Sequence, residues 1–174
     1  NGGTDNTDSD ANVITGRTGS VNLTANNLTL DAGLVQGIPA GKGSIGDRVW
    51  YDMPGGTDGV QDPTETGAPG ITVKLYKDAN NDGVISGAEL TPVATTITDA
   101  LGNYMFGGLD AGNYQVGFSG LQAGYTIAAN DAGADDTKDS DGNTLGSSVA
   151  GNTATAGTSY TGLFSLTQGE DNLT

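Results

Sequence analysis

Apolar residues alternate with polar residues in short runs along much of the chain, and Gly, Asp and Asn separate the runs. In one run, Ile71, Val73 and Leu75 share one side of an extended chain, while the residues between them share the other. A period of two is typical of half-buried β-strands. This pattern predicts strands over residues 45–51, 71–77, 93–98, 103–106, 113–119, 125–129 and 159–167.

Short strands at this spacing favour an all-β fold, an antiparallel β-sandwich of Greek-key type. No stretch has the pattern of an amphipathic helix longer than about two turns. The composition agrees with this fold class, because the 174 residues include 30 Gly and 18 Asp but only 3 Glu. Gly and Asp favour turns over helices.

The charge and the missing residue types narrow the classes of function. A net charge of −15, with six scattered basic residues, argues against nucleic acid and against an anionic membrane surface as partners. No apolar run is long enough to insert into a membrane. Without Cys or His there is no disulfide, no thiolate metal site and no Ser-His-Asp triad, so we expect no enzyme. The chain lacks an initiator Met, and we expect it to be processed or excised from a longer protein.

The chain also repeats part of itself. Residues 8–12 match 139–143, residues 18–24 match 161–167, and residues 27–29 match 172–174. The matched blocks keep one order, which predicts a tandem repeat. We therefore expect residues 1–36 to be the C-terminal strand segment of a preceding repeat, 37–43 to be a linker, and 44–174 to be one module. Alternatively, residues 1–36 pair with a neighbouring subunit by strand addition and form a polymer.

Residues 78–89 have the spacing of a twelve-residue calcium loop. Calcium takes hard oxygen ligands, which such loops supply at positions 1, 3, 5, 7, 9 and 12. These positions are filled by Asp78, Asn80, Asp82, the carbonyl of Val84, Ser86 and Glu89. Gly83 permits the sharp turn, and Ile85 occupies the apolar position. The predicted strands on either side place the loop between strands instead of helices; the alternative is a polar hairpin that binds nothing.

A second acidic group precedes this loop. It comprises Asp52, Asp58, the carbonyl of Val60, Asp62 and Glu65. The group keeps the Asp-Gly pair and the final Glu of a calcium loop, but its first half is longer and contains Pro54. The alternative is a surface turn rich in Gly and Pro.

A third acidic group comprises Asp131, Asp135, Asp136, Asp139 and Asp141. These carboxylates repel one another unless a cation lies between them, so they are a further candidate for calcium. Asp5, Asp8 and Asp10 are the corresponding residues of the first copy. The alternative is a solvated acidic loop. Asp99, in contrast, is predicted to be a turn residue.

Several motifs follow one another in the order of a known family. They are Ser44-Ile-Gly-Asp-Arg-Val-Trp-Tyr-Asp52, Asp58-Gly-Val-Gln-Asp62, Gly70-Ile-Thr-Val-Lys-Leu-Tyr76, Asp99-Ala-Leu-Gly-Asn-Tyr-Met-Phe106 and Leu109-Asp-Ala-Gly-Asn-Tyr-Gln-Val116. Over residues 44–174 the chain resembles the B-repeat domain of serine-aspartate-repeat bacterial surface adhesins.

The resemblance implies a Cna-B-like (prealbumin-like) β-sandwich that binds Ca²⁺ and is repeated in tandem in an extracellular, cell-surface protein. It carries the family's calcium ligands onto Asp78, Asn80, Asp82 and Glu89, and onto Asp58, Asp62 and Glu65. Related modules can contain a Lys–Asn isopeptide bond, but Arg48 stands where a Lys would be expected.

The sequence leaves two kinds of function open. In the first, the chain is a structural module of a stalk or fibre that calcium makes rigid, with neighbouring copies of the module as its partners. In the second, it is an adhesive module that binds a host or cell-surface ligand through its loops or an exposed sheet edge.

Overall fold

The computed structural model describes residues 40–52, 58–132, 135 and 137–172. The chain divides into two units, Asn1–Gly37 and Ile38–Thr174, and the described residues belong to the second. The predicted segment 1–36, residues 37–39 of the predicted linker and Asp136 lie outside the described residues.

The described residues form short β-strands and a single 3-10 helix, η1. In chain order they are β1 (Gly43–Arg48), β2 (Thr72–Asp78), η1 (Gly87–Leu90), β3 (Ala94–Ile97), β4 (Asn103–Leu109), β5 (Gly112–Ser119), β6 (Ser148–Val149), β7 (Asn152–Thr153), β8 (Thr158–Tyr160), β9 (Phe164–Leu166) and β10 (Asp171–Asn172). In this part of the chain no helix has the length and apolar character needed to cross a membrane.

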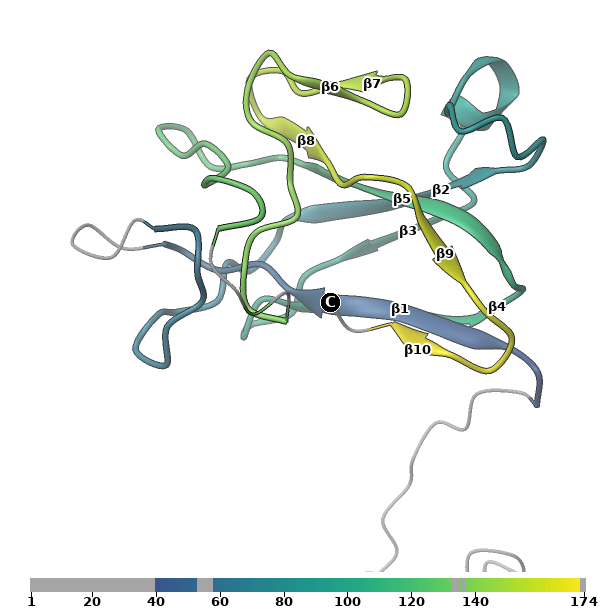
Figure 1. The fold of residues 1–174 in the computed structure, drawn as a ribbon. Helices are drawn as coiled ribbons and strands as arrows, with labels where there is room; N and C mark the ends of the chain where they lie inside the picture. The colour runs from purple at the N-terminus through teal and green to yellow at the C-terminus, as the bar shows by residue number, and fades with distance from the viewer. Residues whose placement is uncertain (1–39, 53–57, 133–134, 136, 173–174) are drawn as a thin grey trace, which may run out of the picture. The chain divides into compact units, whose positions relative to one another are not determined.

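Most of the strands form two sheets that pack against each other, and β6 pairs with β7 in a separate two-stranded sheet (Figure 1). One sheet has the order β10–β1–β4, and the other has the order β3–β2–β5–β8, with β9 also paired to β5. These pairs are antiparallel except β1 with β10, which run parallel with Ser44 opposite Asp171 and Ile45 opposite Asn172. The predicted antiparallel sandwich is confirmed.

The core lies between the two sheets and uses the alternation seen in the sequence. Its buried members are Ile45 from β1, Val73 and Leu75 from β2, Phe106 from β4, Tyr114 and Val116 from β5, and Leu166 from β9. Because successive side chains of a strand point to opposite faces, the polar residues between these positions lie on the outer faces of the sandwich.

Two strand predictions need correction. The prediction over 125–129 is wrong, because this segment joins neither sheet and Tyr125 instead packs on the ring of Tyr51, 4.9 Å between centroids. The predicted strand 159–167 is interrupted between β8 and β9. There the hydroxyl of Thr161 accepts the amide of Val116 at 3.0 Å, so a side chain replaces a backbone carbonyl of the ladder.

A long excursion, residues 142–157, covers the outer face of the five-stranded sheet; we call it the arm. It carries β6 and β7 and lies close to η1 in Figure 1. Gln115, fully buried on β5, fastens the arm to the sheet: its Nε2 donates to the carbonyls of Val149 (3.1 Å) and Thr161 (2.9 Å). Its Oε1 accepts Nδ2 of Asn152 at 2.7 Å.

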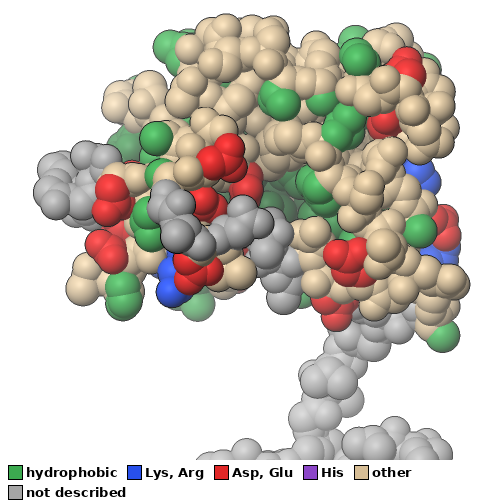
Figure 2. Space-filling view, in the orientation of Figure 1, with side chains coloured by type: hydrophobic (Ala, Val, Ile, Leu, Met, Phe, Trp, Pro, Cys, Tyr) green, Lys and Arg blue, Asp and Glu red, His purple; other side chains and the backbone are tan. Residues whose placement is uncertain are grey.

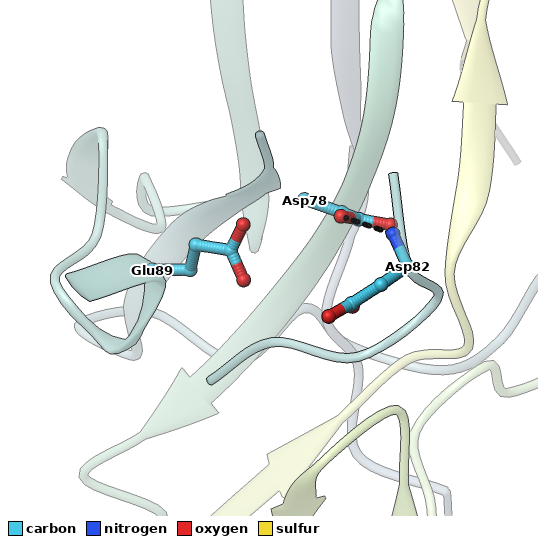
Figure 3. A group of neighbouring side chains, drawn as sticks. All are labelled: Asp78, Asp82 and Glu89. Carbon is cyan, nitrogen blue, oxygen red and sulfur yellow. Dashed lines mark hydrogen bonds between the residues drawn. The ribbon is translucent and has the colours of Figure 1, made fainter. Parts of the chain in front are cut away.

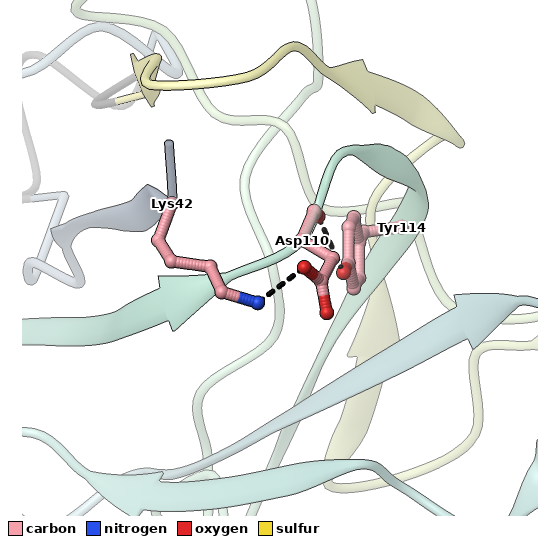
Figure 4. Close-up of polar contacts among 3 residues, drawn as sticks. All are labelled: Lys42, Asp110 and Tyr114. Carbon is pink, nitrogen blue, oxygen red and sulfur yellow. Dashed lines mark hydrogen bonds and ion pairs between the residues drawn. The ribbon is translucent and has the colours of Figure 1, made fainter. Parts of the chain in front are cut away.

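The chain is also held where it enters β1. Lys42, directly before β1, forms an ion pair with Asp110 in the turn between β4 and β5 (Figure 4). The Tyr114 hydroxyl donates to the Asp110 carbonyl at 2.8 Å, and Lys77 Nζ lies 5.4 Å from the Tyr114 ring centre. The hydrogen bond from Lys42 holds the pKa of Asp110 below its usual range.

Candidate metal sites

The loop between β2 and β3 brings three carboxylates together. Asp78 is the last residue of β2, Asp82 lies in the following turn, and Glu89 lies on η1. One oxygen of each lies within 4.8 Å of the other two (Figure 3). Within the described residues, no other three acidic side chains approach one another this closely. The predicted first, fifth and twelfth positions of the loop therefore face a common space.

Asp78 sets the turn. Its two carboxylate oxygens accept the backbone amides of Asp82 (3.2 Å) and Gly83 (3.0 Å), and only 1% of the residue is exposed. Gly83 has φ 83°, a left-handed conformation that favours glycine. The chain is thereby folded back over the end of β2.

Glu89 closes the loop from the other side. Its Oε1 accepts the amides of Ala79 (2.9 Å) and Asn80 (3.2 Å), and its Oε2 accepts the amide of Ser86 (3.2 Å). The carboxylate therefore joins the beginning and the end of the loop. A bidentate acid at the final position is what a calcium loop requires.

Two of the remaining predicted ligands, Asn80 and Val84, are hydrogen-bonded to Asp82. Nδ2 of Asn80 donates to Asp82 Oδ2 at 2.9 Å, and the amide of Val84 donates to Asp82 Oδ1 at 2.9 Å. The donor set is made of oxygen atoms only, from carboxylates, an amide, a hydroxyl and a carbonyl. That chemistry fits Ca²⁺ and does not fit zinc or copper, which prefer nitrogen or sulfur.

Ile85 connects this loop to the arm. Its side chain is buried, with 1% of the residue exposed, and its amide donates to the carbonyl of Ala150 at 2.8 Å. A Cβ atom on Gly151 would lie 2.6 Å from the Ile85 carbonyl, so only glycine permits this close approach. The shape of the loop and the position of the arm therefore depend on each other.

We expect Ile85→Ala to loosen the arm without unfolding the sandwich. Removing a buried aliphatic side chain costs about 2–4 kcal/mol, and this one packs outside the main core. Amide hydrogen exchange at residues 148–153 should accelerate by at least about tenfold, while the β2–β5 ladder stays protected. Val93→Ala, at a position that is 57% exposed, is the control. Unchanged exchange in the arm would show that Ile85 does not hold it.

The second acidic group gathers around Asp52. Its Oδ2 accepts the amide of Gly59 at 3.0 Å, whereas its Oδ1 is buried without a hydrogen-bond partner. Burial raises the pKa of Asp52, and the neighbouring charges of Glu65, Asp58 and Asp62 raise it further against the effect of the Gly59 bond. This crowding fits a cation site, although residues 53–57 lie outside the described residues.

Other bonds order the second half of that group. Asp58 Oδ1 accepts the amide of Val60 at 3.1 Å, and Glu65 Oε2 accepts the amide of Asp62 at 2.8 Å. Glu65 is 7% exposed, and its carbonyl receives a guanidinium bond from Arg48 at 2.8 Å.

The third acidic group is spread over different surroundings. Asp135 forms an ion pair with Lys138 at 2.9 Å and accepts the Thr137 hydroxyl at 2.7 Å, and these bonds lower its pKa to about 2. Asp139 pairs through its backbone with Val60, which places it beside the second acidic group.

Two further members of the third group have contacts of their own. The amide of Asp131 donates to the Ser140 carbonyl at 3.2 Å, and Asp141 lines the same pocket as Tyr104 and helps raise the pKa of the Tyr104 hydroxyl. Calcium binding by the second and third groups stays a prediction.

Asp99 is confirmed as a turn residue. Its Oδ1 accepts the amides of Leu101 (2.8 Å) and Asn103 (2.9 Å), which lowers its pKa. It organises the turn between β3 and β4.

Sequence reasoning missed Asp47. It lies on β1 two residues after Ile45, on the inward face of the strand, and directly opposite Tyr104 of β4. Burial raises its pKa to about 6, although the Arg48 amide and charge oppose the shift. The alternation of apolar and polar residues could have identified it, because Asp47 occupies a position that the pattern predicts to be apolar.

The raised pKa of Asp47 predicts an unusual pH dependence. The folded state binds this proton more tightly than the unfolded state, so the group's contribution to stability is complete below about pH 4 and is lost as pH rises through 6. Asp47→Asn should therefore raise the free energy of unfolding at neutral pH by about 1–2 kcal/mol, with a corresponding rise in Tm. At pH ~4 the substitution should change the stability little. Asp110→Asn, whose pKa is lowered, should not stabilise at neutral pH. A Tm gain of Asp47→Asn that is equal at both pH values would contradict the assignment.

The sequence matches the SdrD B-like domain family over residues 43–165. Over 133 residues, or 76% of this chain, it is 39% identical to serine-aspartate repeat-containing protein F of Staphylococcus epidermidis. Over 143 residues, or 82% of this chain, it is 41% identical to serine-aspartate repeat-containing protein C of Staphylococcus aureus. A shorter match, 46% over 83 residues and 48% of this chain, is to Colossin-B of Dictyostelium discoideum. The matched regions cover 7%, 13% and 2% of these relatives, respectively.

Proposed function

Because the chain belongs to the SdrD B-like domain family, we propose that it is a structural repeat module of an extracellular bacterial surface protein, made rigid by calcium. The proposal assigns no catalytic step to it. The observation that carries the proposal is the meeting of Asp78, Asp82 and Glu89 in a loop with the spacing of a calcium site. These three carboxylates would hold the ion, with Asn80, Ser86 and the Val84 carbonyl as further ligands.

Calcium bound there would offset the mutual repulsion of carboxylates that the fold forces together. The loop begins at the end of β2, the strand between β3 and β5, and its Ile85 contacts the arm. Ordering the loop therefore stiffens both the five-stranded sheet and the arm that covers it. Extracellular calcium is millimolar, which is enough to fill even weak sites of this kind.

The direction of the terminal strands supports a role in a stalk. β10 runs parallel to β1, and its residues lie beside the beginning of β1 (Figure 1). A chain that continued in this direction would leave toward the opposite end of the module from Lys42. We infer that the partners are neighbouring copies of the module, joined head to tail. The relatives that it matches are many times longer than this chain.

The test is the number of calcium ions bound by the full chain, measured by titration calorimetry. The double variant Asp82→Asn, Glu89→Gln should bind one ion fewer than the unchanged chain. Asp110→Asn removes an acid that pairs with Lys42, far along the chain from the loop, and should not change the number. Equal numbers in all three proteins would overturn the assignment of the loop.

A further inference from the structure

A pocket opens between the sheets where β1 ends. Residues 47–52 form one wall, and Tyr104 of β4, Phe118 of β5 and the segment 121–128 form the others. Its volume is about 120 Å³. One water needs about 10–15 Å³ of such volume, so the pocket has room for a small organic group.

The walls of this pocket are mainly aromatic. Trp50 lies on one side, and its indole Nε1 is buried without a hydrogen-bond partner. The ring of Tyr104 meets that of Phe118 edge to face, 5.9 Å between centroids. Tyr125 lies at the mouth of the pocket, 49% exposed and in contact with Tyr51. Aromatic faces attract cations, and quaternary ammonium groups in particular.

Carboxylates make the same pocket negative. Asp47 points inward from β1, and its charge, together with that of Asp141, acts on the buried hydroxyl of Tyr104. Among the residues that the structure describes, Arg48 is the one basic residue that lines the pocket. Its guanidinium is engaged elsewhere, with the carbonyls of Leu101 (3.1 Å) and Glu65 (2.8 Å).

The surroundings add to this charge. Acidic side chains outnumber basic ones on the face shown in Figure 2, and the whole chain has a net charge of −15. We therefore expect the pocket to repel anions. A bare metal ion would be held by Asp52 and Asp139 of the second and third acidic groups, which also line the pocket, and not by its aromatic walls.

We propose that this pocket binds an alkylammonium group, with the charged head beside Asp47 and the carbon atoms against Trp50 and Tyr104. This inference does not rest on the calcium loop at residues 78–89. The group can be a free quaternary amine or the side chain of a lysine on another macromolecule, because both present the same chemistry.

Trp50 is the only tryptophan of the chain, so its fluorescence reports on the pocket directly. The full chain, saturated with calcium at constant ionic strength, is titrated with choline, with the amide of Nα-acetyl-lysine, and with the uncharged carbon analogue of choline. We expect a saturable change in emission with choline or the lysine derivative and none with the uncharged analogue. Which of the two cations binds more tightly identifies the source of the group.

Asp47→Asn should weaken the binding by about tenfold or more, because a buried charge is lost. Asp110→Asn, an exposed acid outside the pocket, should leave it unchanged. Tyr125→Ala, at the exposed mouth, is a second, independent variant, and it should weaken binding several-fold. The proposal is overturned if neither cation binds, if the uncharged analogue binds equally well, or if all variants bind like the unchanged chain.

Discussion

Chelation of calcium should lower the Tm of the module by about 10–15 °C for each site that is emptied. A ligand at about 1,000 times its Kd stabilises the folded state by about 4 kcal/mol, and 1 kcal/mol corresponds to about 3 °C in a module of this size. The effect is large here because the loop 78–89 has no Lys or Arg to balance its acids.

The measurement is a thermal melt of the full chain in excess calcium and in EGTA. The double variant Asp82→Asn, Glu89→Gln should lose part of the difference, because one site is removed and the others are not. Magnesium should restore little of the Tm, since it demands an octahedral site and gives up its waters reluctantly. Identical melts in calcium and EGTA would mean that the acidic loops are solvated turns.

The second large effect is expected at Gln115. In Gln115→Leu the side chain keeps its approximate volume, but Asn152 loses the acceptor of its buried amide and two carbonyls lose a donor. A buried polar group left without its partner costs about 1–3 kcal/mol, so the total is about 2–4 kcal/mol. Tm should fall by about 6–12 °C.

Chemical denaturation gives the free energy directly, and the exposed Gln168→Leu is the matched control. Because Gln115 holds the arm to β5, the variant should also expose residues 142–157 to protease before the sandwich unfolds. A variant as stable as the unchanged chain would show that the arm is held by its apolar contacts alone.

These two expectations concern the same part of the molecule. Gln115 holds the arm from the sheet, and Ile85 holds it from the calcium loop. The effects of calcium removal and of Gln115→Leu on hydrogen exchange in the arm should therefore not be additive, since both changes remove contacts that hold the same segment. Hydrogen exchange of the variant in EGTA would measure this coupling.

The sequence alone determined the local features of this protein. Alternation of apolar and polar residues located β1 to β5, because a strand that buries one face must repeat with a period of two. Spacing located the loop 78–89, since its ligands are separated by a few residues and meet whenever the turn forms. Asp99 was placed in its turn for the same reason: its carboxylate bonds reach Leu101 and Asn103, which follow it by two and four residues.

Tertiary structure decided whatever depends on residues far apart in the chain. Asp139 lies beside Val60, Asp47 faces Tyr104, and the arm lies over Gln115 only because strands pair over long separations. The alternation over 125–129 was misleading, since a strand also needs an edge to pair with and this segment found none. Periodicity records which side of a segment is buried, but packing of the whole chain selects the partner that buries it.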